Sequence, residues 1–395
     1  MRFFQTLLFV ALCAIVTSST FVYAAPTDLE VAGWVPYWND TNGIKDAKKH
    51  LDNIDAVYPF AFTVTSKGEI RDQAGLDKKE WTSFVKAAQK KGVEVIPTVM
   101  ASSGLDTHTI LSDTKLRTRH IEQIVDMVEE GKFDGVGIDY ESKWPDTINY
   151  FSLFLKELKE ALGEKILTCT IEARTPPDSL YKEVPKVLTY ANDYKEIAKY
   201  CDRVELMTYD QQRADLKLNA SKTGQPYMPV ADVDWVRKVV ELALKDIPKE
   251  KILLGMASYG HHYIVTVAPD WYKNYQRIGA LNVPSILEVA KEYKVTPSRN
   301  QAGEMSFTYI PKSSALKLPK SLTIPKDTPK GNIVAARALA YANKTGETVT
   351  FNMGWYSDAE AMKQKIDLAK EFGLRGVALF KFDGEEDQKV WNYLK

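Results

Sequence analysis

Hydrophobic and polar positions follow two different periods along the chain. Short apolar runs rich in β-branched residues, which are typical of buried strands, recur eight times. They occupy residues 30–38, 54–64, 93–100, 133–141, 165–172, 203–209, 252–259 and 376–382. Between most of them lie stretches with helical spacing of apolar positions, at 81–91, 118–130, 147–162, 194–200, 233–244 and 359–372. Glycine follows three of these stretches, as the left-handed end of a helix favours, at positions 92, 163 and 373.

This alternation predicts parallel βαβ units, and eight strands favour an α/β fold of the (β/α)8 TIM barrel type. An open doubly wound sheet is the alternative, but its Gly-rich phosphate turn is absent from the sequence. The alternation of strands and helices is interrupted over residues 264–350, an interval that is too long for a loop. This interval has a strand-like run, a helical stretch and a Pro-rich segment, and we expect a small α+β insertion between strand 7 and strand 8. The barrel would then comprise residues 25–263 and 351–395.

The first 24 residues have the pattern of a signal peptide. Arg2 gives a basic start, residues 3–16 are almost all apolar, and 22–24 resemble an A-x-A cleavage site. An uncleaved membrane anchor is the alternative. No later run approaches the ~20 apolar residues that a membrane span needs. We therefore expect a secreted or extracytoplasmic protein with no stable membrane insertion.

The amino-acid composition limits the classes of molecule that the protein is expected to bind. The chain has 52 basic and 52 acidic residues, so it carries no excess charge that would favour nucleic acid. Its hydrophobic content of 45% excludes a disordered or collagen-like chain, and its 20 Tyr and eight Trp include flat faces suited to sugar rings. Cys169 and Cys201 remain after removal of the leader. They form either one bridge or two buried thiols, and we slightly favour thiols.

Candidate chemistry lies at the end of the fourth predicted strand, where residues 133–141 read FDGVGIDYE. Side chains of a strand alternate between its faces, so Gly137, Asp139 and Glu141 share one face. In a barrel this face points inward, at the end of the strand where active sites lie. Mutual repulsion and burial would keep a proton on one of the two carboxyl groups. The alternative is a solvated loop at the strand end.

The same segment resembles the D-G-x-D-x-D-x-E signature of glycoside hydrolase family 18, which includes chitinases and spore-cortex peptidoglycan hydrolases. Other motifs of this family follow in order along nearly the whole mature chain. They are AGWVPYW at 32–38, LMTYD at 206–210, LGMASYG at 254–260, WYSD at 355–358 and GVALF at 376–380.

The resemblance implies a retaining hydrolase of β-1,4-linked N-acetylglucosamine glycans, in which the acetamido oxygen of the substrate is the nucleophile. Glu141 would protonate the glycosidic oxygen and later activate water, and Asp139 would orient the acetamido group. Tyr209 would donate a hydrogen bond to the acetamido oxygen. The substrate-binding candidates are Asp210, Trp34, Tyr37, Trp38, Met207, Trp355 and Phe380, and packing in the core is an equal alternative for Trp34, Tyr37, Trp38 and Trp355.

Two positions depart from the family pattern. The middle Asp of the signature, which shares a proton with the next Asp, is Gly137 here. The usual Trp at the end of the eighth strand is Phe380, which offers less stacking area and no indole N–H. We expect a shifted pH optimum from the first departure and weaker substrate binding from the second.

Several alternatives stay open. The same scaffold could serve as a glycan-binding lectin with weak or no catalysis, and no feature favours a protein-binding barrel. Chitin, peptidoglycan and the chitobiose core of N-glycans all present the required acetamido group. We expect no cofactor, no metal and a monomer. His261 and His262 are expected as loop histidines near the cleft mouth, because neighbours on extended backbone point apart, and residues 383–387 are expected to form a solvated turn.

Overall fold

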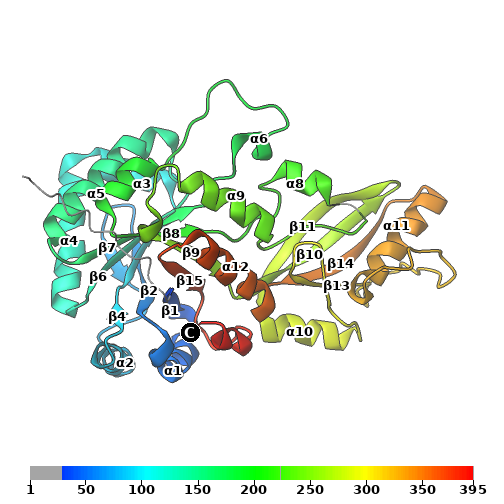
Figure 1. Cartoon of the computed structure of the whole chain (residues 1–395), viewed down its shortest axis with the longest axis horizontal. Coiled ribbons are helices and arrows are strands. Elements are labelled where there is room, and N and C mark those ends of the chain that lie inside the picture. Colours follow the sequence, from blue (N-terminus) through cyan, green and yellow to red (C-terminus); the bar gives the residue numbers. More distant parts are fainter. Residues whose placement is uncertain (1–28, 223, 395) are drawn as a thin grey trace, which may run out of the picture.

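In the computed structural model, which describes residues 29–222 and 224–394, eight parallel strands close into a barrel (Figure 1). The strands are β1 (Glu30–Pro36), β2 (Ala56–Val64), β5 (Thr98–Ala101), β6 (Gly135–Tyr140), β7 (Ile166–Glu172), β8 (Arg203–Met207), β9 (Ile252–Ala257) and β15 (Gly376–Phe380). Strand β1 pairs with both β15 and β2 and so closes the barrel. The predicted (β/α)8 fold is therefore confirmed.

The third predicted strand is divided in two. Strand β4 (Glu94–Val95) and strand β5 both pair with β2, and Ile96 and Pro97 separate them. Proline has no N–H to donate to the ladder, which accounts for the interruption. A short strand β3 (Ile70–Asp72) pairs antiparallel with β2 beside the barrel.

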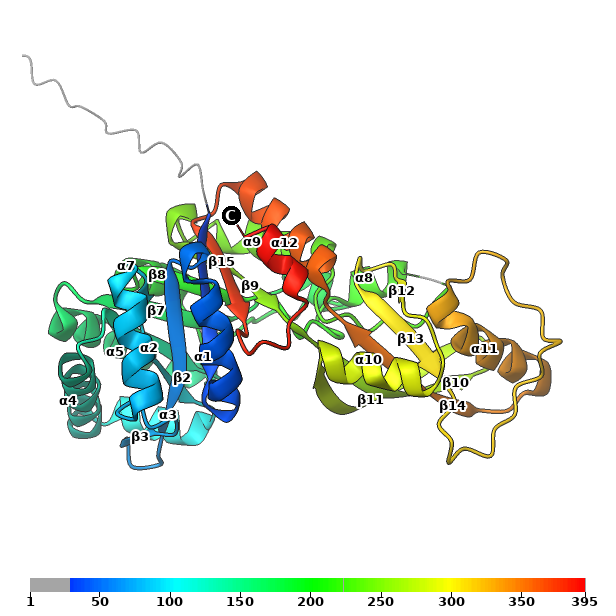
Figure 2. The ribbon, with the colours of Figure 1, turned by 90° about the horizontal axis from the view of Figure 1, so that it is seen from below.

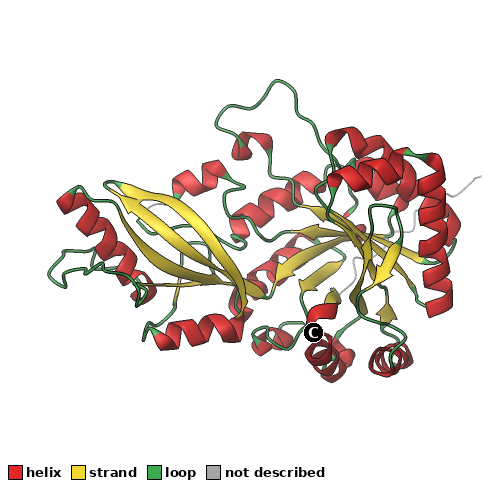
Figure 3. Ribbon diagram, turned by 180° about the vertical axis from the view of Figure 1, so that it is seen from behind, coloured by secondary structure: helices red, strands yellow, loops and turns green. Residues whose placement is uncertain are grey.

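Helices surround the barrel, as Figure 3 shows. They are α1 (Asp40–Lys49), α2 (Lys79–Lys90), α3 (Gly104–Ser112), α4 (Thr114–Gly131), α5 (Ile148–Leu162), α6 (Pro177–Leu180), α7 (Tyr194–Tyr200), α8 (Leu216–Ser221), α9 (Val233–Ala243) and α12 (Ala359–Phe372). Six of these match the predicted helical stretches. Apolar faces of the helices pack against the outside of the strands, with Phe84, Phe154 and Trp235 fully buried. Inside the barrel a separate apolar cluster includes Tyr58 and Ile96.

A lobe stands beside the barrel, between β9 and β15 in sequence (Figure 2). Its antiparallel sheet has the order β11-β10-β14-β13-β12, with helices α10 (Val283–Glu292) and α11 (Ile333–Thr345) packed against it. The strands are β10 (Tyr259–Ala268), β11 (Trp271–Asn282), β12 (Ser298–Arg299), β13 (Met305–Tyr309) and β14 (Val349–Tyr356). The sheet thus begins before residue 264 and ends after residue 350, because β10 follows β9 with only Ser258 between them.

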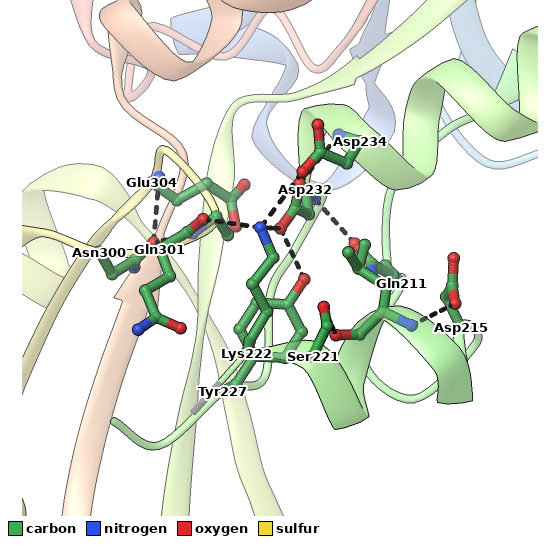
Figure 4. Close-up of polar contacts among 12 residues, drawn as sticks. Gln211, Asp215, Ser221, Lys222, Tyr227, Asp232, Asp234, Asn300, Gln301 and Glu304 are labelled. Carbon is green, nitrogen blue, oxygen red and sulfur yellow. Dashed lines mark hydrogen bonds and ion pairs between the residues drawn. The ribbon is translucent and has the colours of Figure 1, made fainter. Parts of the chain in front are cut away.

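Ion pairs and hydrogen bonds connect the lobe to the barrel (Figure 4). The ammonium group of Lys222 lies 3.3 Å from Asp232 and 3.2 Å from Asp234, and it donates to the backbone oxygen of Gln301 in the lobe. The buried carboxylate of Glu304, also in the lobe, accepts hydrogen bonds from the backbone N–H groups of residues 230 and 231. Charged hydrogen bonds of this kind fix the lobe beside the mouth of the barrel.

Two local predictions are wrong. Cys169 on β7 and Cys201, which follows α7, form a disulfide with Cα atoms 6.1 Å apart, and both are fully buried. Their separation of 32 residues does not reveal that strands β7 and β8 bring them together. Residues 383–387 are not a solvated turn, because Asp383 and Glu386 are buried and Asp383 pairs with Lys381.

The proposed signal peptide, residues 1–24, lies outside the described residues. Within the described part of the chain, no helix combines the length and the apolar character needed to cross a membrane.

Candidate active site

A cavity of about 350 Å³ opens at the carboxyl ends of the barrel strands. Its lining contains carboxyl groups, aromatic rings and few other polar side chains. The lining residues are Trp34, Phe60, Asp139, Glu141, Thr170, Glu172, Ala173, Met207, Tyr209, Asp210, Ala214, Trp235, Tyr259 and Phe380. Barrels of this class place their chemistry at this end, so the cavity is the candidate active site.

Strand β6 brings Asp139 and Glu141 into the cavity together, as the alternation of strand side chains predicts. Glu141 directly follows the strand, and its backbone N–H donates to Ala101 on β5 at 2.7 Å. Gly135 lets β6 approach β7 closely, because an added Cβ would lie 2.1 Å from the backbone oxygen of Ile166. The backbone around the two carboxyl groups is therefore held by both neighbouring strands.

Both carboxyl groups have a raised pKa. Asp139 is 4% exposed, and burial, followed by the charge of Glu141, raises its pKa well above the usual value. Burial also raises the pKa of Glu141, and the neighbouring Glu172 raises it further. Because two carboxylates in one dry site resist ionising together, the pair retains a proton that an acid catalyst could deliver.

Glu172, at the end of β7, is a functional candidate that no motif in the sequence indicates. Its carboxylate accepts hydrogen bonds from the backbone N–H of Ser142 at 3.0 Å and from Nδ2 of Asn192 at 2.8 Å. The ammonium of Lys143 lies 3.7 Å away. These contacts hold the carboxylate of Glu172 beside Glu141, the residue that directly follows β6. The only signal in the sequence was its position at the carboxyl end of a predicted barrel strand.

The positive charge of Lys143 offsets part of the negative charge of these carboxyl groups. Its side chain is fully buried, its Nζ donates to the backbone oxygen of Tyr140, and it lies 4.5 Å from the centre of the Phe151 ring. Burial lowers the pKa of Lys143, while Glu172, Asp139 and Glu141 oppose that change. The positive charge in turn lowers the pKa of both Asp139 and Glu141, against the effect of burial.

The lobe supplies two groups to the site. From β10, Tyr259 donates its hydroxyl to Oδ1 of Asp210 at 3.0 Å, and Nε2 of His261 lies 2.6 Å from the same oxygen. Desolvation would raise the pKa of Asp210, but the contacts with His261 and Tyr259 and the charge of Arg277 outweigh it and lower the pKa. Asp210 is thus an ionised acceptor at the mouth of the cavity.

The two histidines are on a strand rather than in a loop, so that expectation is wrong. His261 contacts Asp210, whereas Nε2 of His262 meets the hydroxyl of Tyr309. Their side chains have different partners, as neighbours on an extended strand should. In the described residues no group of three or more His, Cys, Asp or Glu side chains is placed to hold a metal ion.

Aromatic rings form the apolar part of the cavity. Phe380 lines the cavity, its ring centre 5.7 Å from that of Trp34 and 5.9 Å from that of Tyr209, and Met207 lines the same cavity. Trp34 is anchored by a 3.1 Å hydrogen bond from Nε1 to the hydroxyl of Thr98. Trp34, Met207, Tyr209 and Phe380 are therefore brought together as the motifs indicated.

The remaining aromatic candidates lie elsewhere. Trp38 is 51% exposed and touches the cavity lining through Phe60, at 5.6 Å between ring centres, while Tyr37 packs edge-on against Trp38. Trp355 belongs to the lobe core, is 1% exposed and donates from Nε1 to Glu304 at 2.6 Å. Trp355 does not line the cavity, so it offers no face on which a sugar could stack there.

Threonine hydroxyls surround the position of the missing family Asp. A Cβ added at Gly137 would lie 3.0 Å from Oγ1 of Thr168 and 3.2 Å from Oγ1 of Thr98. Within the described part of the chain, Oδ1 of Asp139 accepts no hydrogen bond. Because residue 137 is a glycine, no carboxyl group stands at this position beside Asp139.

The model of glycosyl hydrolases family 18 matches residues 30–385. The chain is 21% identical over 288 residues to a protein named uncharacterized glycosylase YvbX of Bacillus subtilis (strain 168), covering 72% of this chain and 67% of that protein. The first curated relatives are matched over only 52% to 67% of their own lengths.

Solved structures share the fold. The spore cortex-lytic enzyme SleL of Bacillus cereus superposes with a TM-score of 0.66 at 18% identity, covering 93% of this chain and 74% of that one. A chitinase from Cycas revoluta, solved in complex with (GlcNAc)3, superposes with a TM-score of 0.64 at 16% identity, covering 92% of this chain and 98% of that one.

Proposed function

Since the chain belongs to glycosyl hydrolases family 18 and is therefore a glycoside hydrolase, we propose that it is an exported retaining enzyme that cleaves β-1,4-linked N-acetylglucosamine glycans of chitin or peptidoglycan type. The proposal rests on the joint placement of Asp139, Glu141 and Tyr209 in one cavity at the carboxyl ends of the strands. The buried disulfide supports export, because such bonds persist mainly in oxidising compartments.

The reaction has two steps. Glu141 transfers its proton to the glycosidic oxygen while the acetamido oxygen of the same sugar attacks C1, so the leaving sugar departs and a cyclic oxazolinium forms. The carboxylate of Asp139 accepts the acetamido N–H and stabilises the positive charge that develops there. The hydroxyl of Tyr209 donates to the acetamido oxygen and orients it. Glu141, now ionised, then removes a proton from water as that water attacks C1, and the configuration at C1 is retained.

Polar and aromatic residues of the cavity also provide contacts for a bound sugar. Asp210 is held ionised by His261 and Tyr259 and accepts hydrogen bonds from sugar hydroxyls. Phe380 and Trp34 present apolar surface beneath the sugar ring. Outside the cavity, Trp38 packs against the lining residue Phe60 and Tyr37 packs against Trp38, so the two rings extend this aromatic surface toward solvent.

The deciding experiment compares wild type with Glu141→Gln on chitin oligomers and on peptidoglycan glycan strands, scored by release of reducing ends. We expect the variant to lose roughly 10²- to 10⁴-fold in kcat, as the removal of a general acid does. Early products analysed by NMR should carry the β configuration. Equal background release by both proteins would refute catalysis, and tight binding without turnover in both would identify a lectin.

The role of Asp139 has a separate test. A thiazoline analogue of the cyclic intermediate should bind wild type and bind Asp139→Ala much more weakly, because the variant lacks the carboxylate that faces the positive ring. Equal affinity for both proteins would contradict the assigned role.

A further inference from the structure

A second cavity of about 400 Å³ adjoins the first, a volume within the usual range for small-molecule sites. Glu172, Ala173 and Ala214 line both cavities, so the two are continuous beside the catalytic carboxyl groups. The loop that follows α6, which rises above the barrel in Figure 1, supplies part of the wall of the second cavity. A ligand that occupies the first cavity can therefore extend into the second.

Arg174 lies in this second cavity with an unusual set of contacts. The centre of its guanidinium group lies 3.7 Å from the ring centre of Tyr190 and 4.0 Å from that of Tyr194. One N–H donates to the backbone oxygen of Asn192 at 2.6 Å. Two aromatic rings and one carbonyl hold the guanidinium in place, so little conformational entropy is lost when it binds a further group.

The positive charge of Arg174 is not balanced by a carboxylate. In residues 29–222 and 224–394, none of the ion pairs involves Arg174. The other two charges in the cavity, Lys143 and Glu172, pair with each other at 3.7 Å. The second cavity therefore carries a net positive charge, whereas the first is lined by Asp139, Glu141, Glu172 and Asp210. The electrostatics of the lining residues therefore favour an anion in the second cavity over one in the first.

We propose that the second cavity binds a carboxylate-bearing sugar unit next to the bond that is cut, with Arg174 as its recognition group. The inference rests on the proposed glycosidase function and narrows its substrate to an acidic glycan of the peptidoglycan type over neutral chitin. The planar guanidinium edge matches a carboxylate with two parallel hydrogen bonds. The carboxylate could belong to the lactyl ether of a muramic acid unit or to its attached peptide, and both present the same chemistry.

Rates on matched substrates test this preference. The substrates are glycan strands stripped of peptides, the same strands with their lactyl carboxylates converted to amides, peptide-bearing strands with free or amidated peptide carboxylates, and a neutral chitin hexamer. We expect wild-type kcat/KM to be at least about tenfold higher on a carboxylate-bearing strand than on its amidated form, as the loss of a charged hydrogen bond predicts. Arg174→Gln should lose this ratio, and Arg174→Lys should keep part of it.

Controls separate recognition from folding. Arg237→Gln removes a guanidinium that pairs with Glu371 at the outside of the barrel, and it should keep the wild-type ratio. Thermal melting of both Arg174 variants shows whether the fold persists. A preference seen only with peptide-bearing strands assigns the carboxylate to the peptide. Equal wild-type rates on carboxylate and amide forms, with and without peptides, would overturn the proposal.

Binding to a protein that does not cleave its ligand tests carboxylate recognition by Arg174 separately from catalysis. By calorimetry on the Glu141→Gln protein, stripped strands should bind about tenfold more tightly than amidated strands, and adding Arg174→Gln should abolish the difference. A wild type that hydrolyses no glycan would refute the proposed function. The role of Arg174 would be refuted if the Glu141→Gln protein bound carboxylate and amide forms equally, both for stripped strands and for peptide-bearing strands.

Discussion

The imidazole of His261 lies 2.6 Å from the carboxylate of Asp210 and so links the lobe to the barrel at the active site. Asp210 follows β8 of the barrel, whereas His261 is the third residue of the first lobe strand. The lobe therefore contributes to the candidate active site, because its His261 influences the ionisation and orientation of Asp210, which lines the cavity.

Replacing His261 by Ala should weaken substrate use. Asp210 would lose its shortest hydrogen bond, and its pKa would rise because desolvation would then be less opposed. We expect KM for chitin oligomers to increase about tenfold, with a smaller change in kcat. The control is His262→Ala on the same strand, which removes only a contact with Tyr309. Equal kinetic effects of the two variants would show that His261 does not act through Asp210.

Replacing Glu172 by Gln should shift the pH dependence of the reaction. Removing a negative charge beside Glu141 lowers the pKa of Glu141, so the acid loses its proton at a lower pH. The basic limb of the kcat/KM profile should therefore move to lower pH. Glu241→Gln, an exposed change on α9, should leave the profile in place. An unshifted limb in Glu172→Gln would mean that its charge does not reach Glu141.

The barrel and the joint placement of Asp139 and Glu141 could be predicted from the sequence, because both depend on periodic patterns. Buried parallel strands are continuous apolar runs, and the alternation along 135–141 fixes which side chains face inward. Helix α1 was not predicted, because its mainly polar sequence lacks a clear helical pattern of apolar positions and contains Gly43. An added Cβ at Gly43 would lie 2.7 Å from the backbone oxygen of Phe382, so tertiary packing explains this glycine.

Partners that are distant in sequence could not be predicted. His261 contacts Asp210, which is 51 residues away in the sequence, and Asn192 contacts Glu172, which is 20 residues away. Such contacts produce no periodic pattern in the sequence. The disulfide likewise depends on the pairing of β7 with β8. Trp355 shows the converse, because a motif residue that matched the family in sequence packs into the lobe core.

Stability should decrease as pH rises because of Glu386. Burial, followed by the adjacent Asp46 carboxyl, raises the pKa of Glu386 to about 8. Between the ordinary value of 4.5 and about 8, the folded state holds a proton that the unfolded state has released, so each pH unit costs up to about 1.4 kcal/mol. The contribution is fully present below pH 4.5 and is lost as pH approaches 8.

The Glu386→Gln protein tests this dependence. Its neutral amide mimics the protonated acid and can still accept from Nε1 of Trp391, which donates to Glu386 at 3.2 Å. Urea unfolding from pH 5 to pH 9 should give a flatter dependence of the unfolding free energy than in wild type. Glu164→Gln, at an exposed site, should retain the wild-type slope. Parallel slopes for wild type and Glu386→Gln would exclude a shared proton at this site.

Removing the disulfide should destabilise the barrel without changing its chemistry. Replacing both Cys169 and Cys201 by Ala releases a loop of 32 residues in the unfolded chain, which corresponds to roughly 3–4 kcal/mol. Denaturant unfolding of this variant and of wild type measures the loss. Alkylation of unfolded, unreduced protein that comprises residues 25–395 should label no thiol, and reduction should expose two. Equal stability of the two proteins, or labelling before reduction, would show that the bond does not form in this protein.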